Sequence, residues 1–225
     1  MKSWVLAWMV LAPIAAAHDI ITTKITFSNE VARILYQRCV ACHRDGGSAF
    51  SLATYAEARP WAKAIKEEVL SRRMPPWGAI KGFGEFQDDR SLTQEDLTIL
   101  ADWVEGGAPE GDPRVLPHVP HFTPREEIVR PAGTRELPLD GAAAIKEAVS
   151  LVAIRPHKLP EGASVKVVAE RADGSIAPVI WIENYRAAFR HTYILRSPLY
   201  LAGGSHLLMF PASAGSFSLF TQPAQ

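Results

Sequence analysis

Two cysteines and a histidine within five residues constrain this chain more than any other feature. The run Cys39-Val40-Ala41-Cys42-His43 follows the spacing Cys-x-x-Cys-His, which is typical of covalent attachment of a c-type haem. Two thiols at this spacing can form thioether bonds with the two vinyl groups of one porphyrin. The adjacent imidazole then lies close enough to the iron to be its axial ligand. The motif predicts one covalent haem c held by Cys39, Cys42 and His43.

Three other interpretations of the cysteine pair explain less. The chain has only two cysteines in 225 residues, so a zinc site would lack further ligands at suitable spacing. A disulfide suits an exported protein, but it would close a very short loop and leave His43 unexplained. A thioredoxin-like redox pair should follow a strand, whereas this pair ends a helical pattern. Haem attachment accounts for all three side chains, with the others kept as alternatives.

The first 17 residues have the features of a secretory signal peptide. Lys2 gives a short positive region, residues 4–17 are apolar, and Ala15-Ala16-Ala17 matches a cleavage site. The apolar run is shorter than the ~20 residues that span a bilayer. We expect a mature chain that begins near His18 and is periplasmic or secreted. The alternative is an uncleaved anchor, which would provide the one membrane contact.

Charge gives no sign of a nucleic-acid partner. Lys and Arg number 24, as do Asp and Glu, and the formal net charge is zero. No basic stripe or charged block favours nucleic acid or an anionic membrane surface. A chain that carries haem is expected to meet a redox partner protein; the sequence specifies neither that protein nor an oligomeric state.

Helical periodicity dominates residues 28–110. Three helices are expected, from Ser28 or Asn29 to Cys39, from Thr54 to about Arg72, and from Thr93 to Gly106. The last two begin with the spacing of a capping box, Thr54 with Glu57 and Thr93 with Asp96. This order of elements resembles class I cytochrome c domains, and residues 18–112 are assigned to such a domain.

Met74 is the expected second axial ligand of the iron. Beyond the signal peptide the chain has two methionines, Met74 and Met209, and no histidine besides His43 lies between residues 19 and 117. Met74 follows a helical pattern and precedes Pro75-Pro76, which end the helix and stiffen the backbone. A thioether favours ferrous iron and raises its potential relative to two histidines. The alternative is a core methionine.

The second half of the chain has a β pattern. Five prolines between residues 111 and 135 predict a linker over 113–135. The expected strands are 149–154, 164–170, 176–182, 192–195, 199–201, 206–210 and 216–220, with a hairpin turn at Asp173-Gly174. Residues 136–225 are therefore expected to form a small all-β sandwich or jelly-roll. The predicted fold class is multidomain, an all-α class I cytochrome c domain followed by this β domain.

Residues 26–112 resemble a group of bacterial c-type cytochrome domains fused to copper type II, ascorbate-dependent monooxygenase-like proteins. The motifs that carry the resemblance are the Cys-x-x-Cys-His run, residues 54–66, Met74-Pro75-Pro76-Trp77, residues 89–92 and residues 103–109. The resemblance implies that Cys39, Cys42, His43 and Met74 hold the haem. It also implies a monooxygenase-like β domain after the cytochrome domain.

The β half matches those monooxygenases only in degenerate form. Residues 151–167, 180–182 and 193–201 resemble their last sandwich, where the related strand usually carries a His-x-His copper pair. Here His157 is followed at that spacing by Leu159. His157, His191 and His206 remain as a possible copper or zinc set. We expect a monohaem carrier of single electrons rather than an enzyme. The alternative is the haem-containing electron-donor module of a copper monooxygenase-like enzyme, and an enzyme of this kind would be a copper- or haem-dependent oxidoreductase.

Overall fold

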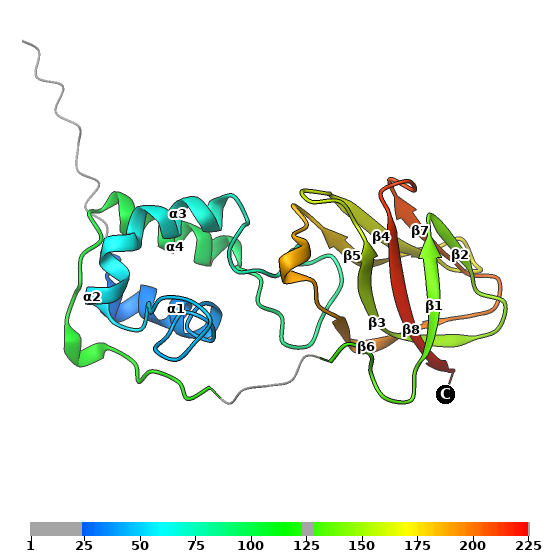
Figure 1. Cartoon of the computed structure of the whole chain (residues 1–225), viewed down its shortest axis with the longest axis horizontal. Coiled ribbons are helices and arrows are strands. Elements are labelled where there is room, and N and C mark those ends of the chain that lie inside the picture. Colours follow the sequence, from blue (N-terminus) through cyan, green and yellow to red (C-terminus); the bar gives the residue numbers. More distant parts are fainter. Residues whose placement is uncertain (1–23, 123–127, 225) are drawn as a thin grey trace, which may run out of the picture.

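The computed structural model describes residues 24–122 and 128–224 (Figure 1). The predicted signal peptide, residues 1–17, lies outside the described residues. Within residues 24–122 and 128–224 no helix is long and apolar enough to cross a membrane. The α-helices occupy the first half of the described chain and the strands the second, and Figure 1 shows them at opposite ends of the molecule.

The helices are short. They are the π-helical turn η1 (Phe27–Val31), α1 (Ala32–Arg38), α2 (Tyr55–Ala58), η2 (Arg59–Trp61), α3 (Ala62–Leu70), α4 (Gln94–Glu105), η3 (Pro113–Val115) and, between two strands, η4 (Ala187–Phe189). Both predicted capping boxes are confirmed, at Thr54 and at Thr93. The predicted first N-cap is wrong, because Thr26 accepts the cap hydrogen bond from the Asn29 amide while Ser28 is buried.

The helices pack around a hydrophobic cluster that we call the helical core. Its fully buried large side chains include Phe27, Leu35, Leu100 and Trp103. The rings of Phe27 and Trp103 lie 6.3 Å apart between centroids, so the turn before α1 packs against α4. The Trp103 indole N–H donates to the Pro109 carbonyl at 3.0 Å, which satisfies its polar atom inside the core.

Eight antiparallel strands form the rest of the fold. They are β1 (Arg135–Asp140), β2 (Ala142–Ala144), β3 (Val149–Lys158), β4 (Val165–Glu170), β5 (Ile176–Ile182), β6 (Tyr193–Leu201), β7 (His206–Phe210) and β8 (Ser216–Pro223). Their order is β5-β4-β7-β2-β1-β8-β3-β6. The register between β1 and β2 contains the single pair Asp140↔Ala142, so the strands divide there into two antiparallel sheets of four.

The two sheets enclose a second hydrophobic cluster, which we call the β core. It combines residues of both sheets, including Val167, Ile180 and Leu207 from one and Leu139, Leu151 and Leu219 from the other. The predicted bounds of β5 and β7 are confirmed. The two segments predicted at 192–195 and 199–201 form the single strand β6, and β1 and β2 were not predicted.

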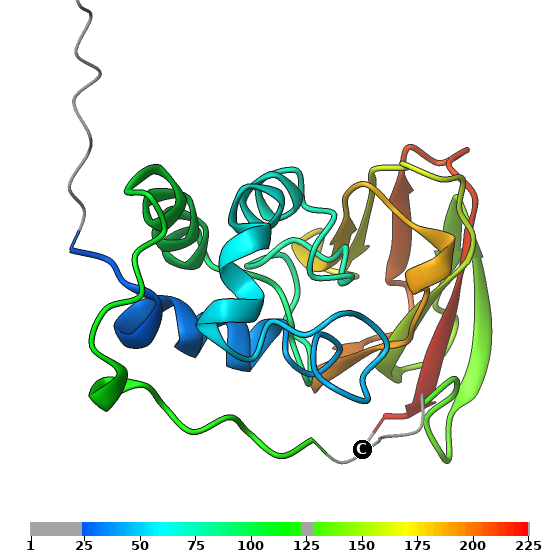
Figure 2. The ribbon, with the colours of Figure 1, turned by 60° about the vertical axis from the view of Figure 1, so that its left-hand side comes forward.

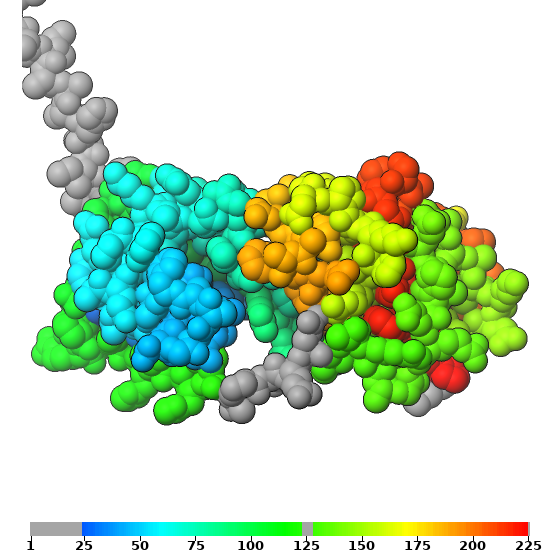
Figure 3. Space-filling view, in the orientation of Figure 1, coloured from blue at the N-terminus to red at the C-terminus, as the bar shows by residue number. Residues whose placement is uncertain are grey.

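A segment without helices, residues 71–93, connects α3 to α4 and is called the strap here. It bonds to the two strands at the ends of the sheet order, β5 and β6. The Ile80 amide donates to the Trp181 carbonyl of β5 at 2.8 Å, and the Gln87 amide donates to the Ile194 carbonyl of β6 at 2.8 Å. The strap therefore covers the exposed edges of both sheets. Figures 2 and 3 show this junction from two sides.

The predicted fold class is wrong. The described chain is mostly β, since strand residues outnumber α-helical ones, and its longest helix is α4 with 12 residues. No all-α cytochrome domain is evident in the described residues. The physical reason lies in the strap, because Trp77, Ala79 and Phe86 are buried in the β core. Helical periodicity before and after the strap gave no sign that its apolar side chains belong to the sheets.

Candidate functional site

The Cys-x-x-Cys-His motif continues the end of α1 as a tight turn. Cys39 is the C-terminal cap of α1. Its carbonyl accepts hydrogen bonds from the Cys42 amide at 3.0 Å and the His43 amide at 2.9 Å. The two cysteines are half-buried and form no disulfide. One turn of backbone thus holds both thiols and the imidazole of the motif.

The loop after the motif folds back onto it. The Ala49 amide donates to the Cys42 carbonyl at 3.2 Å, and the Leu52 amide donates to the His43 carbonyl at 3.0 Å. This return requires glycine at position 47, because a Cβ atom there would lie 2.2 Å from the Cys42 carbonyl oxygen. Val40 is fully buried in the helical core and fixes the motif to it.

His43 is oriented by the carbonyl of Phe50. Its Nδ1 lies 3.0 Å from that oxygen. A carbonyl only accepts hydrogen bonds, so Nδ1 carries the proton and donates. Nε2 is then the nitrogen with the free lone pair, which is the tautomer that an axial imidazole ligand needs.

Exposed aromatic rings extend from His43 across the surface. The Phe50 ring meets the His43 ring edge-on at 4.9 Å between centroids, and Trp61 stacks on Phe50 at 4.4 Å. Phe50 and Trp61 are 49% and 45% exposed. Two large apolar rings left in contact with water beside a candidate ligand are typical of a surface that something else covers.

The Cys39 thiol is held in its neutral form. Burial, and next the neighbouring Cys42, raise the pKa of Cys39 to about 12, although Arg38 acts in the opposite direction. A thiol of this kind is a poor metal ligand, because the thiolate is the form that binds metals. Formation of a carbon–sulfur bond leaves a neutral thioether, which fits the low polarity around Cys39.

Met74 lies near the start of the strap, half-buried against the helical core. The Met74 amide donates to the Glu68 carbonyl of α3 at 3.2 Å. The Glu68 side chain also holds Arg73, with two hydrogen bonds of 2.8 and 2.9 Å. A cavity of about 30 Å³ lies beside Met74, between the strap and α4. The structure thus packs Cys39 and Met74 against the same hydrophobic cluster.

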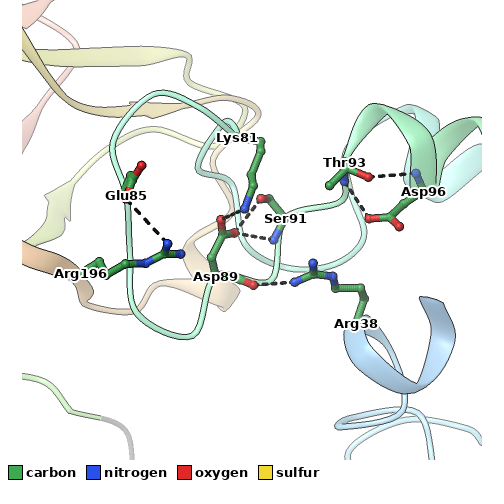
Figure 4. Close-up of polar contacts among 8 residues, drawn as sticks. All are labelled: Arg38, Lys81, Glu85, Asp89, Ser91, Thr93, Asp96 and Arg196. Atoms are coloured by element: carbon green, nitrogen blue, oxygen red, sulfur yellow. Dashed lines mark hydrogen bonds and ion pairs between the residues drawn. The ribbon is translucent and has the colours of Figure 1, made fainter. Parts of the chain in front are cut away.

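Arg38, which the sequence interpretation did not single out, lies next to Cys39. Its Nη1 donates to the Asp89 carbonyl of the strap at 2.7 Å (Figure 4). Its Nε atom is buried and has no hydrogen-bond partner among the described residues. A buried guanidinium nitrogen in this state is costly unless an anionic acceptor reaches it. The helical pattern placed Arg38 on α1 but gave no sign of this unsatisfied donor.

The histidines and the methionine of the β half do not gather into a metal site. His157 of β3 and His206 of β7 are exposed, and His191 stacks on Trp77 at 4.8 Å. Met209 is buried in the β core. Across the ranges described above, no group of three or more His, Cys, Asp or Glu side chains is arranged to hold a metal ion.

No protein-family model matches the chain, and no curated protein matches it.

Proposed function

We propose that this chain carries one covalent haem c and transfers single electrons outside the cytoplasm. The observation that carries the proposal is the pairing of a two-cysteine turn with an adjacent histidine whose Nδ1 donates to the Phe50 carbonyl. This arrangement provides two attachment points and one oriented nitrogen ligand within a single turn. Met74, packed against the same core as Cys39, supplies the second ligand.

The residues around the motif fit a porphyrin. Cys39 and Cys42 are free thiols, and the exposed rings of Phe50 and Trp61 offer apolar surface for a large flat molecule to cover. The buried, unpartnered Nε of Arg38 suits a negatively charged edge group such as a haem propionate. The bound haem would supply an iron that alternates between ferric and ferrous states.

The chain's own residues would perform the remaining tasks. The two thioethers tether the group, and the Phe50 carbonyl keeps His43 in one tautomer and orientation. The soft sulfur of Met74 favours the ferrous state and raises the potential. Packing around Val40 and Trp103 excludes water from the side of the motif that faces the core. With His43 and Met74 both bound, the iron would need little rearrangement when an electron enters or leaves.

The proposal includes export and a protein partner. Covalent haem attachment accords with the predicted signal peptide, which would direct the chain to the periplasm or outside the cell. We propose that the partner is another redox protein. Phe50 and Trp61 lie beside His43 at the surface, which supports electron exchange on this side of the helices.

The test is production of the exported chain together with haem-attachment machinery. We expect a pyridine haemochrome spectrum of a c-type haem, one iron per chain, no stoichiometric copper and no rapid binding of carbon monoxide. The control is the double variant Cys39→Ser, Cys42→Ser, which should lack covalent haem. Exported wild-type protein that stays colourless after maturation, with both thiols free to alkylate, would falsify the proposal.

A further inference from the structure

The backbone crosses from one hydrophobic core to the other immediately after Met74. Met74 packs on the helical core, whereas Trp77 is buried in the β core. Only Pro75 and Pro76 lie between them. Each proline ring fixes its own φ, so this crossing is stiff. A displacement of Trp77 should therefore also displace Met74.

The β half holds Trp77 through Tyr193 of β6. The Tyr193 hydroxyl donates to the Trp77 carbonyl, and the two rings meet edge-on at 5.0 Å between centroids. Phe86 and His191 contact the Trp77 ring as well, at 6.2 and 4.8 Å. Burial, and next Tyr185, raise the pKa of Tyr193, so its hydroxyl keeps the proton that it donates.

Gly78, the residue after Trp77, connects this part of the strap to the end of β5. Gly78 has a φ of +74°, a conformation that favours glycine. Its carbonyl accepts a hydrogen bond of 3.0 Å from the Glu183 amide, just beyond β5. A Cβ atom at this position would lie 3.3 Å from the Tyr193 hydroxyl oxygen. Trp77 is thus hydrogen-bonded to β6, and Gly78 to the residue that follows β5.

We propose that Tyr193 is a positioning residue for Met74, so that the β half sets the strength of the bond between the Met74 sulfur and the haem iron. The inference rests on the proposed function. The hydrogen bond of Tyr193 goes to the Trp77 carbonyl, three residues after Met74. Tyr193 acts through the Trp77 carbonyl and the two prolines, as outer-shell hydrogen bonds do when they orient metal ligands. The β domain is then part of the electron-transfer site without contributing a ligand.

The test measures how easily imidazole replaces Met74 in the full-length ferric holoprotein. Imidazole binds iron only where Met74 has left, so its apparent affinity reports the sulfur–iron equilibrium. Loss of one buried hydrogen bond should loosen that equilibrium by about five- to tenfold, and Tyr193→Phe should bind imidazole more tightly by that factor. The sulfur-to-iron charge-transfer band should weaken in parallel. Gly78→Ala should change both measurements in the same direction.

The matched control is Tyr200→Phe, in the same strand, where the tyrosine is 54% exposed. Its imidazole affinity should equal that of the wild type. Equal affinities for Tyr193→Phe and wild type, even with a lower melting temperature for Tyr193→Phe, would overturn the inference and leave only a structural role.

The same experiment separates this inference from the proposed function. Wild-type chain without covalent haem would overturn both. If haem attaches but Met74→Ala leaves the imidazole affinity unchanged, the ligand assignment fails, and the inference fails with it. If Met74→Ala tightens imidazole binding strongly and Tyr193→Phe does not, the proposed function stands and the role of Tyr193 is rejected.

Discussion

In the proposed holoprotein, the sulfur atom of Met74 would set the potential of the iron. Met74→His would keep two ligands on the iron but replace a soft thioether with a nitrogen that stabilises ferric iron better. We expect the midpoint potential to fall by on the order of 0.1 V, within the ~0.8 V range that axial ligands span. Redox titration of the holoprotein measures it. A potential equal to that of the wild type would mean that Met74 does not bind the iron.

A second residue-scale prediction concerns Cys39 in the chain before haem attachment. Because its pKa is raised to about 12, few Cys39 thiolates exist at neutral pH, and alkylation by iodoacetamide should be slow. The rate at Cys39 is best measured in the variant Cys42→Ser, which removes the smaller contribution of Cys42 and keeps the larger one of burial. It should keep rising with pH well above the ordinary pKa of a thiol. In urea the same thiol should titrate at its ordinary pKa and react much faster near pH 9.

The raised pKa of Cys39 also determines how the stability of the haem-free chain changes with pH. Between the ordinary pKa and about 12, the folded chain keeps the proton on Cys39 while the unfolded chain releases it. Stability of the haem-free chain should therefore fall as pH rises through this window. Cys39→Ser, which has no thiol to titrate there, should show a smaller decrease. Identical pH profiles for the two proteins would contradict the assignment.

At the scale of elements, the strap is held by a carboxylate between its two ends. Asp89 accepts hydrogen bonds from Lys81 at 2.5 Å and from the amide and hydroxyl of Ser91 at 2.8 and 2.6 Å (Figure 4). Burial raises the pKa of Asp89, but these donors outweigh it and the net shift is downward. The Asp89 backbone carbonyl also binds Arg38, so the strap and the end of α1 share this residue.

Replacement of Asp89 by Asn should loosen the strap. The variant keeps the shape but loses the charge, which should reduce the free energy of unfolding by about 1–2 kcal/mol at pH 7. A lowered carboxyl pKa stabilises the fold above the unfolded-state value of ~4 and ceases to do so as pH falls below it. The free energy of unfolding of Asp89→Asn should therefore fall less than that of the wild type between pH 7 and pH 3. Urea unfolding at several pH values in this range measures it.

Glu85→Gln is the control for that experiment. Glu85 lies in the same strap, and its ion pair with Arg196 spans 3.7 Å between side chains that are 60% and 76% exposed. Exposed pairs of this kind contribute ~0–1 kcal/mol. If Glu85→Gln destabilised the chain as much as Asp89→Asn, general charge balance would explain the effect rather than the bonds to Lys81 and Ser91.

Local patterns predicted those elements whose signals lie close together in the sequence. The capping boxes at Thr54 and Thr93 and the strands β5 and β7 depend on residues within one turn or one strand. The strand β1 was missed because Pro138 interrupts it, and β2 because three alanines carry no alternation. At the site, the motif gave Cys39, Cys42 and His43 as candidates, but not the Phe50 carbonyl, since a backbone atom leaves no mark in the sequence.

The strap could not be predicted for a different physical reason. Trp77 and Phe86 are apolar residues without helical or strand periodicity, and such residues can be buried against any nearby core. Their partners, Tyr193 and Leu195, lie more than a hundred residues later. Only the packed structure shows that they belong to the β core, and this is why the expectation of an independent all-α domain failed.

On the scale of the whole molecule, the strap should make the two halves unfold as one cooperative unit. It is covalently continuous with α3 and α4, bonds to β5 and β6, and buries its own side chains in the β core. Unfolding of the sheets should therefore release Trp77, and with it Met74. We expect chemical unfolding followed by haem absorbance and by far-ultraviolet circular dichroism to give coincident transitions in the wild-type holoprotein.

Phe86→Ala tests this coupling, because Phe86 is 2% exposed and fixes the far end of the strap to β6. Removal of such a ring should cost about 3–5 kcal/mol. Without the Phe86 ring, the haem absorbance should change at a lower denaturant concentration than the far-ultraviolet circular dichroism of the sheets. The single transition should then separate into two. Phe210→Ala, at a phenylalanine 53% exposed on β7, should leave the midpoint within ~0.5 kcal/mol of the wild type. Two separate transitions already present in the wild type would mean that the helices and the sheets unfold independently, and that the strap transmits nothing between them.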